Sequence, residues 1–283
     1  MKTSTETKIK IARFISKVIV GIRSIFGLSP IVRVERRGVR WSLDLREGID
    51  LAIYLGVYEP ETIKALQSLV KSGDIVLDIG ANIGAITLPL ANLVGVAGQV
   101  IVFEPTAWAY GKLEKNLSLN SNLIDRIKAE QIMLLDEGKE PPSLIYSSWS
   151  LVNEEDELTH PTHKGRLMTT DGVRGISLDR YIEENSVEKI DLIKLDVDGY
   201  ELDVIKGASK TLSRYSPRII LELAPHVQEE KEQLEDLLFE LKSANYRLED
   251  LTSRKPIAMK RQVIEKLCPE GGGINVLAIP QAN

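Results

Sequence analysis

The stretch Val76-Leu77-Asp78-Ile79-Gly80-Ala81-Asn82-Ile83-Gly84 decides the fold, and the run Gln99-Val100-Ile101-Val102-Phe103-Glu104-Pro105 follows it along the chain. Each run is a short apolar segment with an acidic residue, Asp78 or Glu104, near its end. In an open α/β sheet, a strand that stops at glycines before a helix builds a ligand crevice, and an acid at the tip of the next strand can hold a ribose diol. The two runs therefore predict a nucleoside site.

The spacing of the glycines narrows the kind of nucleoside. Gly80 and Gly84 frame a tight turn in which backbone amides can approach a ligand, but the Gly-x-Gly-x-x-Gly pattern of dinucleotide sites is missing. Asp78 precedes the turn on the same strand, and a carboxylate there suits a ligand with a sulfonium and an ammonium group better than a diphosphate. These residues favour S-adenosylmethionine over a nicotinamide dinucleotide.

A third run adds acids to the same edge of the sheet. Ile190–Gly199 reads Ile-Asp-Leu-Ile-Lys-Leu-Asp-Val-Asp-Gly and places Asp196 and Asp198 where the strand emerges. The next strand ends in Leu-Glu-Leu-Ala-Pro-His, which brings Glu222 and His226 near that edge. His226 is the candidate general base, because the usual histidine pKa lies nearest neutrality, and the three acids are the alternatives. A divalent metal ion held by this cluster is the less favoured interpretation.

Strand-like and helix-like segments alternate through most of the chain, which predicts an α/β fold with a mainly parallel sheet and helices on both faces. We expect strands at 75–79, 99–104, 127–134, 190–196, 217–223, 246–251 and 274–279, and helices at 84–94, 107–120, 200–213 and 228–243. The last two strands have no obvious helix between them, so we expect them to pair antiparallel at one edge.

Residues 1–55 are expected to form an N-terminal extension, and residues 56–283 the ligand-binding domain, with an insert at about 136–175. The insert holds the pair His160 and His163, whose spacing across a proline is a weak metal signal. Apolar residues at helical spacing among Lys and Arg predict a basic amphipathic helix over residues 1–26. One interpretation of this helix is a peripheral membrane contact or a partner helix. The equally favoured alternative is a helix packed on its own domain or on a dimer mate. A hairpin with its turn at Arg37-Gly38 is expected next.

Composition sets limits on the class of protein. The chain has 283 residues, a net charge of -5 and one cysteine, Cys268, so no intrachain disulfide can form and a reducing cytoplasm is expected, with membrane association as an addition. There is no extensive basic face with interleaved aromatic residues, so we expect no nucleic-acid partner. No stretch reaches the roughly 18 uninterrupted apolar residues of a membrane span.

The three runs, together with Lys206-Gly207-Ala208, resemble the FkbM family of S-adenosylmethionine-dependent methyltransferases over about residues 56 to 251. The resemblance implies the class I, Rossmann-like methyltransferase sheet of seven strands with the last one antiparallel. It also implies O-methylation of a hydroxyl on a small-molecule or glycan acceptor, such as a sugar or natural product, with S-adenosylhomocysteine as the second product. In one respect the chain departs from the family, because Asp198 stands where a glutamate is more common.

Carried over by position, the resemblance implies roles for the following residues. The methionine part of the cofactor falls to Asp78, Gly80, Asn82 and Gly84, the ribose to Glu104, and the adenine edge to the segment from Met133 to Asp136. Glu59 resembles a position that closes over the cofactor, and Asp196 borders both the cofactor and the reacting atoms. Two other classes stay open from the sequence, a nicotinamide-dependent oxidoreductase and a non-catalytic cofactor-binding scaffold.

Overall fold

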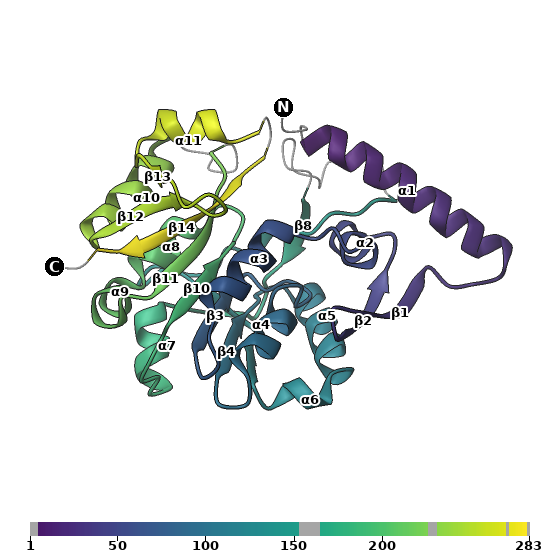
Figure 1. The fold of residues 1–283 in the computed structure, drawn as a ribbon, viewed down its shortest axis with the longest axis horizontal. Coiled ribbons are helices and arrows are strands. Elements are labelled where there is room, and N and C mark those ends of the chain that lie inside the picture. The colour runs from purple at the N-terminus through teal and green to yellow at the C-terminus, as the bar shows by residue number, and fades with distance from the viewer. Residues whose placement is uncertain (1–4, 153–164, 226–230, 270–271, 282–283) are drawn as a thin grey trace.

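The computed structural model describes residues 5–152, 165–225, 231–269 and 272–281. An eight-stranded sheet runs through the molecule in the order β13-β12-β14-β11-β10-β3-β4-β5 (Figure 1). Its strands are β3 (Ile75–Ile79), β4 (Gln99–Phe103), β5 (Ile127–Glu130), β10 (Leu192–Leu195), β11 (Arg218–Leu223), β12 (Tyr246–Asp250), β13 (Pro256–Ile257) and β14 (Ile274–Pro280). The five strands from β5 to β11 are parallel, and β14 lies antiparallel between β11 and β12. The predicted fold class is confirmed, and the short β13 adds an eighth strand at one edge.

Helices cover both faces of the sheet because successive strand residues point to opposite sides. Val76, Val100 and Val102 belong to one buried cluster with α3 (Pro60–Leu69), α4 (Thr87–Val94) and α5 (Ala107–Ser118). Leu77 and Ile101 belong to the second cluster with α7 (Leu178–Glu184), α8 (Glu201–Lys206), α9 (Ser209–Tyr215) and α10 (Lys231–Ser243). The carboxyl ends of the parallel strands therefore meet at one edge, between two layers of helices.

Three expected elements differ in detail. The strand expected at 127–134 divides at Gln131, and its second half, β6 (Ile132–Leu134), leaves the sheet to pair in parallel with β9 (Arg174–Ile176). The helix expected at 200–213 divides into α8 and α9 around Gly207, where a Cβ atom would overlap the Leu135 carbonyl oxygen. The prediction that no helix lies between the last two strands was wrong, because α11 (Arg261–Leu267) lies before β14. It is short and buries Ile264, which gives little periodic signal.

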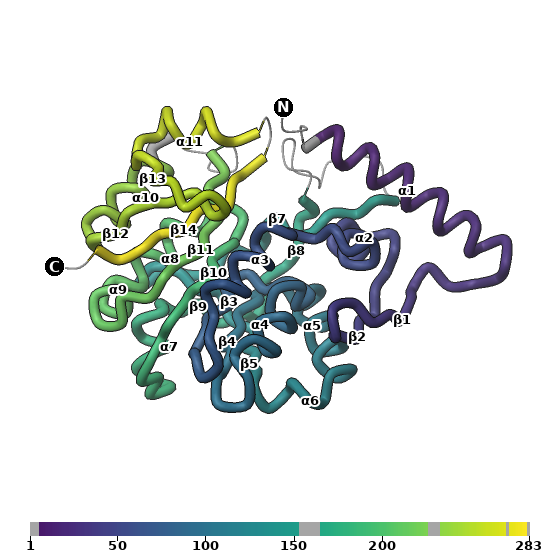
Figure 2. Tube along the Cα trace, viewed as in Figure 1, coloured from purple at the N-terminus to yellow at the C-terminus, as the bar shows by residue number. Residues whose placement is uncertain are grey.

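The N-terminal region forms a helix and a hairpin at one end of the molecule, with the C-terminal strands at the other (Figure 2). α1 spans Thr5–Ile25, and β1 (Ile31–Arg36) pairs with β2 (Val39–Asp44) through the predicted turn, where Arg37 and Gly38 both have positive φ. A further helix, α2 (Gly48–Leu55), was not expected. Among the residues described, no helix combines the length and hydropathy that crossing a bilayer requires.

The insert contributes a second hairpin beside the sheet edge. β7 (Leu144–Ser147) pairs antiparallel with β8 (Arg166–Thr169). The segment directly after β7 is hydrogen-bonded to the N-terminal region. The Gly48 amide donates to the Trp149 carbonyl, and the Leu151 amide donates to the Arg46 carbonyl. His160 and His163 lie outside the described residues, so their proposed metal signal stays untested.

Candidate active site

The glycine turn after β3 packs tightly on the neighbouring strand. Gly80 has a φ of +84°, and a Cβ atom there would overlap the Asp196 carbonyl oxygen. Gly84 has a φ of +88°, and its Cβ atom would lie 2.8 Å from Leu113 Cδ1. A side chain at either position would strain the backbone and displace its neighbours. Gly80 therefore lets the turn after β3 pack against the carboxyl end of β10, and Gly84 lets the end of the turn pack against Leu113 of α5.

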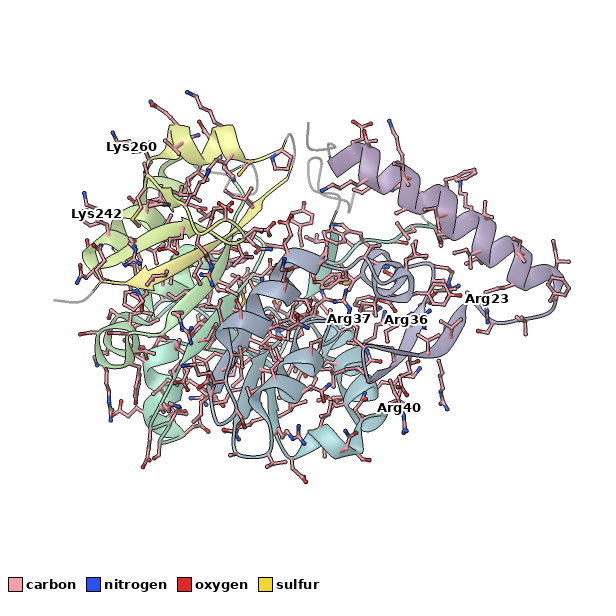
Figure 3. All side chains as sticks on the ribbon, in the orientation of Figure 1. Arg23, Arg36, Arg37, Arg40, Lys242 and Lys260 are labelled. Carbon is pink, nitrogen blue, oxygen red and sulfur yellow. The ribbon has the colours of Figure 1, made fainter. Side chains whose placement is uncertain are left out.

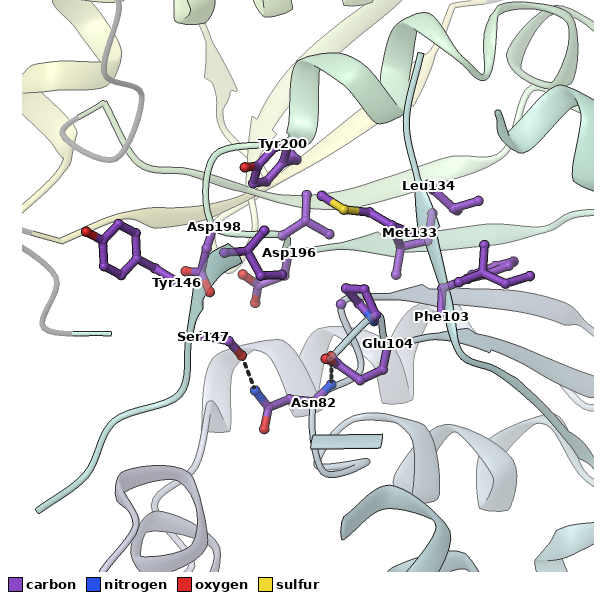
Figure 4. Close-up of a pocket in the computed structure, with 16 residues that line it drawn as sticks. Asn82, Phe103, Glu104, Met133, Leu134, Tyr146, Ser147, Asp196, Asp198 and Tyr200 are labelled. Carbon is purple, nitrogen blue, oxygen red and sulfur yellow. Dashed lines mark hydrogen bonds between the residues drawn. The ribbon is translucent and has the colours of Figure 1, made fainter. Parts of the chain in front are cut away.

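Asn82 connects this turn to two other parts of the cleft (Figure 4). Its amide donates to Glu104 Oε2 at 2.9 Å, and its Nδ2 donates to Ser148 Oγ at 3.0 Å and Ser147 Oγ at 3.3 Å. Glu104 also accepts from the amide and hydroxyl of Thr106, at 2.9 and 2.6 Å. Burial raises the Glu104 pKa, while these hydrogen bonds oppose the rise. The carboxyl group is thus fixed at the tip of β4, where the sequence predicts the ribose contact.

Asp78 lies beneath the turn. Its carboxyl group is buried in the layer of α3 and α4 and accepts a hydrogen bond of 2.6 Å from the Thr87 hydroxyl. Burial raises the Asp78 pKa to about 6, although the Thr87 hydrogen bond and the positive charge of Lys194 both act to lower it. Asp78 is not among the residues that line the cleft, so an effect on a cofactor would act through the turn and through its charge.

Three carboxyl groups gather where β10 and β11 end. One oxygen from each of Asp196, Asp198 and Glu222 lies within 4.8 Å of the others. Lys194, which precedes Asp196 by two residues and so shares its face of the strand, is 1% exposed and places Nζ 2.8 Å from Asp196 Oδ2. The structure thus brings together both predicted acids of β10 and the acid of β11 around one buried ammonium group.

The three carboxyl groups of this acid cluster have different pKa shifts. Burial alone would raise the Asp196 pKa, but the charge and hydrogen bond of Lys194 together with a hydrogen bond from Glu222 lower it. Burial and the Asp196 charge raise the Glu222 pKa well above its usual value, and the two carboxyl groups share a hydrogen bond. Asp198 also has a strongly raised pKa, from burial and then from Asp196. Asp196 is therefore the most acidic member, paired with Lys194, whereas the pKa values of Glu222 and Asp198 lie above their usual range.

The loop that carries Asp198 is held by another buried acid. Asp198 has a φ of +48°, which is unfavourable for a residue with a side chain. The Glu201 carboxylate accepts hydrogen bonds from the Val197 and Gly199 amides, both at 3.2 Å, on either side of Asp198. Glu201 is the first residue of α8, so these bonds reach back from the helix to the loop that precedes it. They fix the strained backbone that presents Asp198 to the cleft.

The cleft between these groups is narrow. Its walls include Gly80, Asn82, Phe103, Glu104, Met133, Tyr146, Ser147, Asp196, Asp198 and Tyr200 (Figure 4). The cavity has a volume of about 50 Å³, against about 300–1,000 Å³ for sites that enclose small molecules. β7 covers the cleft, because Tyr146 and Ser147 line it and both serines after Tyr146 bond to Asn82. The donor groups suit an adenosyl ligand, and β7 forms part of the wall that keeps the cavity smaller than such a ligand.

Other predicted residues lie at the margin of the cleft or away from it. Glu59 stands just before α3 and accepts a bond of 3.3 Å from Asn275 Nδ2. Asp136 accepts a bond from the Glu137 amide and borders a separate hollow with Ser177, so it does not join Met133 in the cleft wall. His226 lies outside the described residues.

Sequence reasoning missed two groups at the site. Lys194 gave a signal that could have been used, because a lysine inside the run Leu-Ile-Lys-Leu of a buried strand needs a charged partner on its own face. Tyr146 and Ser147 gave none, because they belong to an irregular insert whose position depends on tertiary contacts.

The sheet order with one reversed strand, the glycine turn and the acids at the ends of β4 and β10 define a class I methyltransferase domain. The family model described as "Methyltransferase FkbM domain" matches residues 78–248 of this chain. The chain therefore belongs to this family.

Two curated relatives share less than a third of their residues with this chain over the matched region. The chain is 28% identical to hexuronic acid methyltransferase AglP of Haloferax volcanii, over 54% of this chain and 58% of the relative. It is also 28% identical to 2-O-methyltransferase NoeI of Sinorhizobium fredii, over 52% of this chain and 62% of the relative. The solved structure of methyltransferase FkbM from Methylobacillus flagellatus KT has 19% sequence identity and a TM-score of 0.45, over 79% of this chain and 51% of that one. The chain thus spans about three fifths of the length of these two curated relatives.

Proposed function

We propose that this chain is an S-adenosylmethionine-dependent O-methyltransferase that acts on a hydroxyl of a sugar, a glycan or a related natural product. The observation that carries the proposal is the meeting of Glu104, the carboxylate that we propose for a ribose diol, with Asp196 and Asp198 in one cleft. Membership of the FkbM family supports methyl transfer. The names of two relatives, a hexuronic acid methyltransferase and a 2-O-methyltransferase, support a sugar-like acceptor.

The residues of the cleft suit the cofactor in chemistry. Glu104 would hold the ribose hydroxyls, Gly80 and Asn82 the methionine part, and Met133 with Phe103 would supply the apolar wall for adenine. Gly84 supports the turn, and Glu59 remains the residue proposed to close over the cofactor. Asp136 borders a separate hollow, so we do not assign it to the adenine edge. When bound, S-adenosylmethionine supplies a methyl group on a positively charged sulfur and leaves as S-adenosylhomocysteine.

We assign the proton transfer to Asp198. A sugar hydroxyl is a weak acid, so a positioned base assists the attack of its oxygen on the methyl carbon. Asp196 is engaged with Lys194, whereas Asp198 lines the cleft on a loop fixed by Glu201. In its ionised form Asp198 can accept the proton that the acceptor oxygen releases, and its raised pKa makes that carboxylate a stronger base than an ordinary aspartate. Asp196 orients the acceptor beside it, and His226 remains the second candidate base.

The test compares Asp198→Asn with His226→Ala. Labelled S-adenosylmethionine and a panel of sugars and uronic acids identify the acceptor, and calorimetry with S-adenosylhomocysteine and with NADH measures cofactor choice. We expect binding of S-adenosylhomocysteine only, and a loss of about 100-fold or more in turnover for Asp198→Asn with unchanged cofactor affinity. Full turnover by Asp198→Asn together with its loss in His226→Ala would transfer the base role to His226. Binding of NADH alone would refute the methyltransferase proposal.

Three further assignments accompany this function. A divalent ion at Asp196, Asp198 and Glu222 is less favoured, because the Lys194 ammonium already balances a negative charge in that cluster. The proposed location is the cytoplasm, in keeping with a single cysteine. Residues 1–26 are proposed as a contact region, for a membrane surface or for a second copy of the chain.

A further inference from the structure

The outward face of α1 carries a continuous apolar stripe. We define the stripe by its residues at intervals of three or four, which share one face of the helix: Ile11, Phe14, Val18, Ile22 and Ile25. Their exposed fractions run from 43% at Val18 to 82% at Ile25. Phe26 and Leu28 continue the apolar surface beyond the end of the helix, at 73% and 53% exposed. Single exposed apolar residues are normal on a protein surface, but a contiguous row marks an interaction site.

The fold itself does not need this stripe. α1 is held by its other face, where the Ser16 hydroxyl donates to the Leu45 carbonyl at 2.7 Å. Ile15 and Ile19 pack there against the buried cluster that includes Leu45. The helix is therefore already docked on the domain, with the apolar stripe directed away from it.

The charge around the stripe is positive. α1 contains five Lys and Arg residues and one acid, Glu6, which pairs with Lys10 at 2.6 Å. Lys10 and Lys17 precede Phe14 and Val18 by four and one residues and are exposed beside the stripe. The arginines of the adjacent hairpin lie at the same end of the molecule, as the labels of Arg36 and Arg40 show (Figure 3).

This positive region contrasts with the rest of the chain. Residues 5–44 hold nine Lys and Arg and three acids, a net charge of +6. Since the whole chain carries -5, the remaining residues carry -11. An anionic surface would therefore attract the helix and hairpin and repel the remainder, which orients the molecule as it binds.

We propose that α1 binds in the plane of an anionic membrane surface, with its apolar stripe in the boundary between headgroups and acyl chains and its lysines among the headgroups. An amphipathic helix with a basic polar face has the composition of such interfacial helices. The contact is a surface contact, since no helix of the described residues is long and apolar enough to span a bilayer. A second copy of the chain offers a weaker match, because the stripe would have to pair with another basic stripe or with an acidic, polar surface.

The test is sedimentation of the full chain with vesicles of phosphatidylcholine alone or mixed with phosphatidylglycerol. Two double variants test the proposal. The stripe variant combines Phe14→Ser with Ile22→Ser, and the lysine variant combines Lys10→Gln with Lys17→Gln. The matched control is Phe239→Ser, which removes an apolar side chain of similar exposure, 65%, from α10. Thermal unfolding of each variant verifies its fold, and the readout needs no turnover, so it stands independently of the proposed function.

We expect the chain to sediment with the anionic vesicles and much less with phosphatidylcholine. The lysine variant should bind about 25-fold more weakly, since each lysine near an anionic surface contributes about fivefold. The stripe variant should lose binding by about tenfold or more, while the Phe239→Ser control keeps it. Equal binding to both vesicle types, or no binding, would overturn the proposal. So would a stripe variant that binds vesicles normally but converts a dimer to a monomer in sedimentation velocity.

Discussion

Lys194 is the charged side chain on which the acid cluster depends. It is buried in the middle layer of the fold and lies 2.8 Å from Asp196. Replacing it by methionine keeps the volume but leaves the partly buried Asp196, whose side chain is 26% exposed, without its cation, which costs about 3 kcal/mol of unfolding free energy. Urea unfolding measures the loss. The matched control is Lys189→Met, which breaks a pair of similar length with Asp191, at 2.9 Å on the surface, and should cost at most about 1 kcal/mol. Equal losses for the two variants would contradict the central role of Lys194.

Asp78 makes stability depend on pH. Burial raises its pKa from 3.8 to about 6, so between these values the folded chain binds more protons than the unfolded chain. Stability contributed by the protonated carboxyl group is therefore complete below pH 4 and is lost as pH rises to about 6, a total of about 3 kcal/mol. Asp78→Asn removes this dependence and can still accept the Thr87 hydrogen bond. We expect the variant to gain stability relative to the wild type across this window, in urea titrations at a series of pH values. A difference that stays constant from pH 4 to 7 would show that Asp78 does not titrate there.

At the scale of elements, we expect β7 to control access to the cleft. The Asn82 bonds to Ser147 and Ser148 hold it over a cavity of about 50 Å³. Removing both hydroxyls by Ser147→Ala with Ser148→Ala destabilises the closed position by about 1 kcal/mol or more, so S-adenosylhomocysteine should bind about five- to tenfold faster. Stopped-flow tryptophan fluorescence measures the rate, and Ser118→Ala on the exposed end of α5 is the control. An unchanged or slower association rate in the double variant would mean that β7 does not limit access.

The sequence predicts best those elements whose pattern is local. β3 has the predicted bounds, and the turn with Gly80, Asn82 and Gly84 meets Glu104 and Asp196 as expected, because parallel strands end at one edge. The division of the strand at Gln131 was not predictable, since Ile-Lys-Ala-Glu before it and Ile-Met-Leu after it are both compatible with one continuous strand and only the pairing of β6 with β9 separates them. The position of β7 over the cleft was not predictable either, because it depends on tertiary contacts. Its contacts with Asn82 and with residues 46–48 join segments far apart in the chain.

At the scale of the whole molecule, the N-terminal region combines a docked helix with a hairpin that belongs to the core. Trp41, Leu43 and Leu45 are at most 3% exposed and lie in the same buried cluster as β3. The hairpin is also tied to α5, since the Ser42 amide donates to Asn116 Oδ1 at 2.9 Å. The sequence predicts an extension that ends at residue 55, and these contacts suggest where such an extension can be separated.

Deletion of residues 1–29 should leave a folded domain, whereas deletion of residues 1–46 should not. The shorter deletion removes α1, which is attached by one face. The longer one also removes Trp41, Leu43 and Leu45, each of which contributes about 1.5–3 kcal/mol by burial. Together these losses approach the whole stability of a typical domain, about 5–15 kcal/mol. Circular dichroism melting curves and S-adenosylhomocysteine binding measure the outcome, and Leu43→Ala in the full chain, with an expected loss of about 2–5 kcal/mol, separates the core contribution from chain length. A cooperative melt of residues 47–283 near the temperature of the full chain would show that the hairpin is dispensable, and that the methyltransferase domain begins close to the predicted boundary.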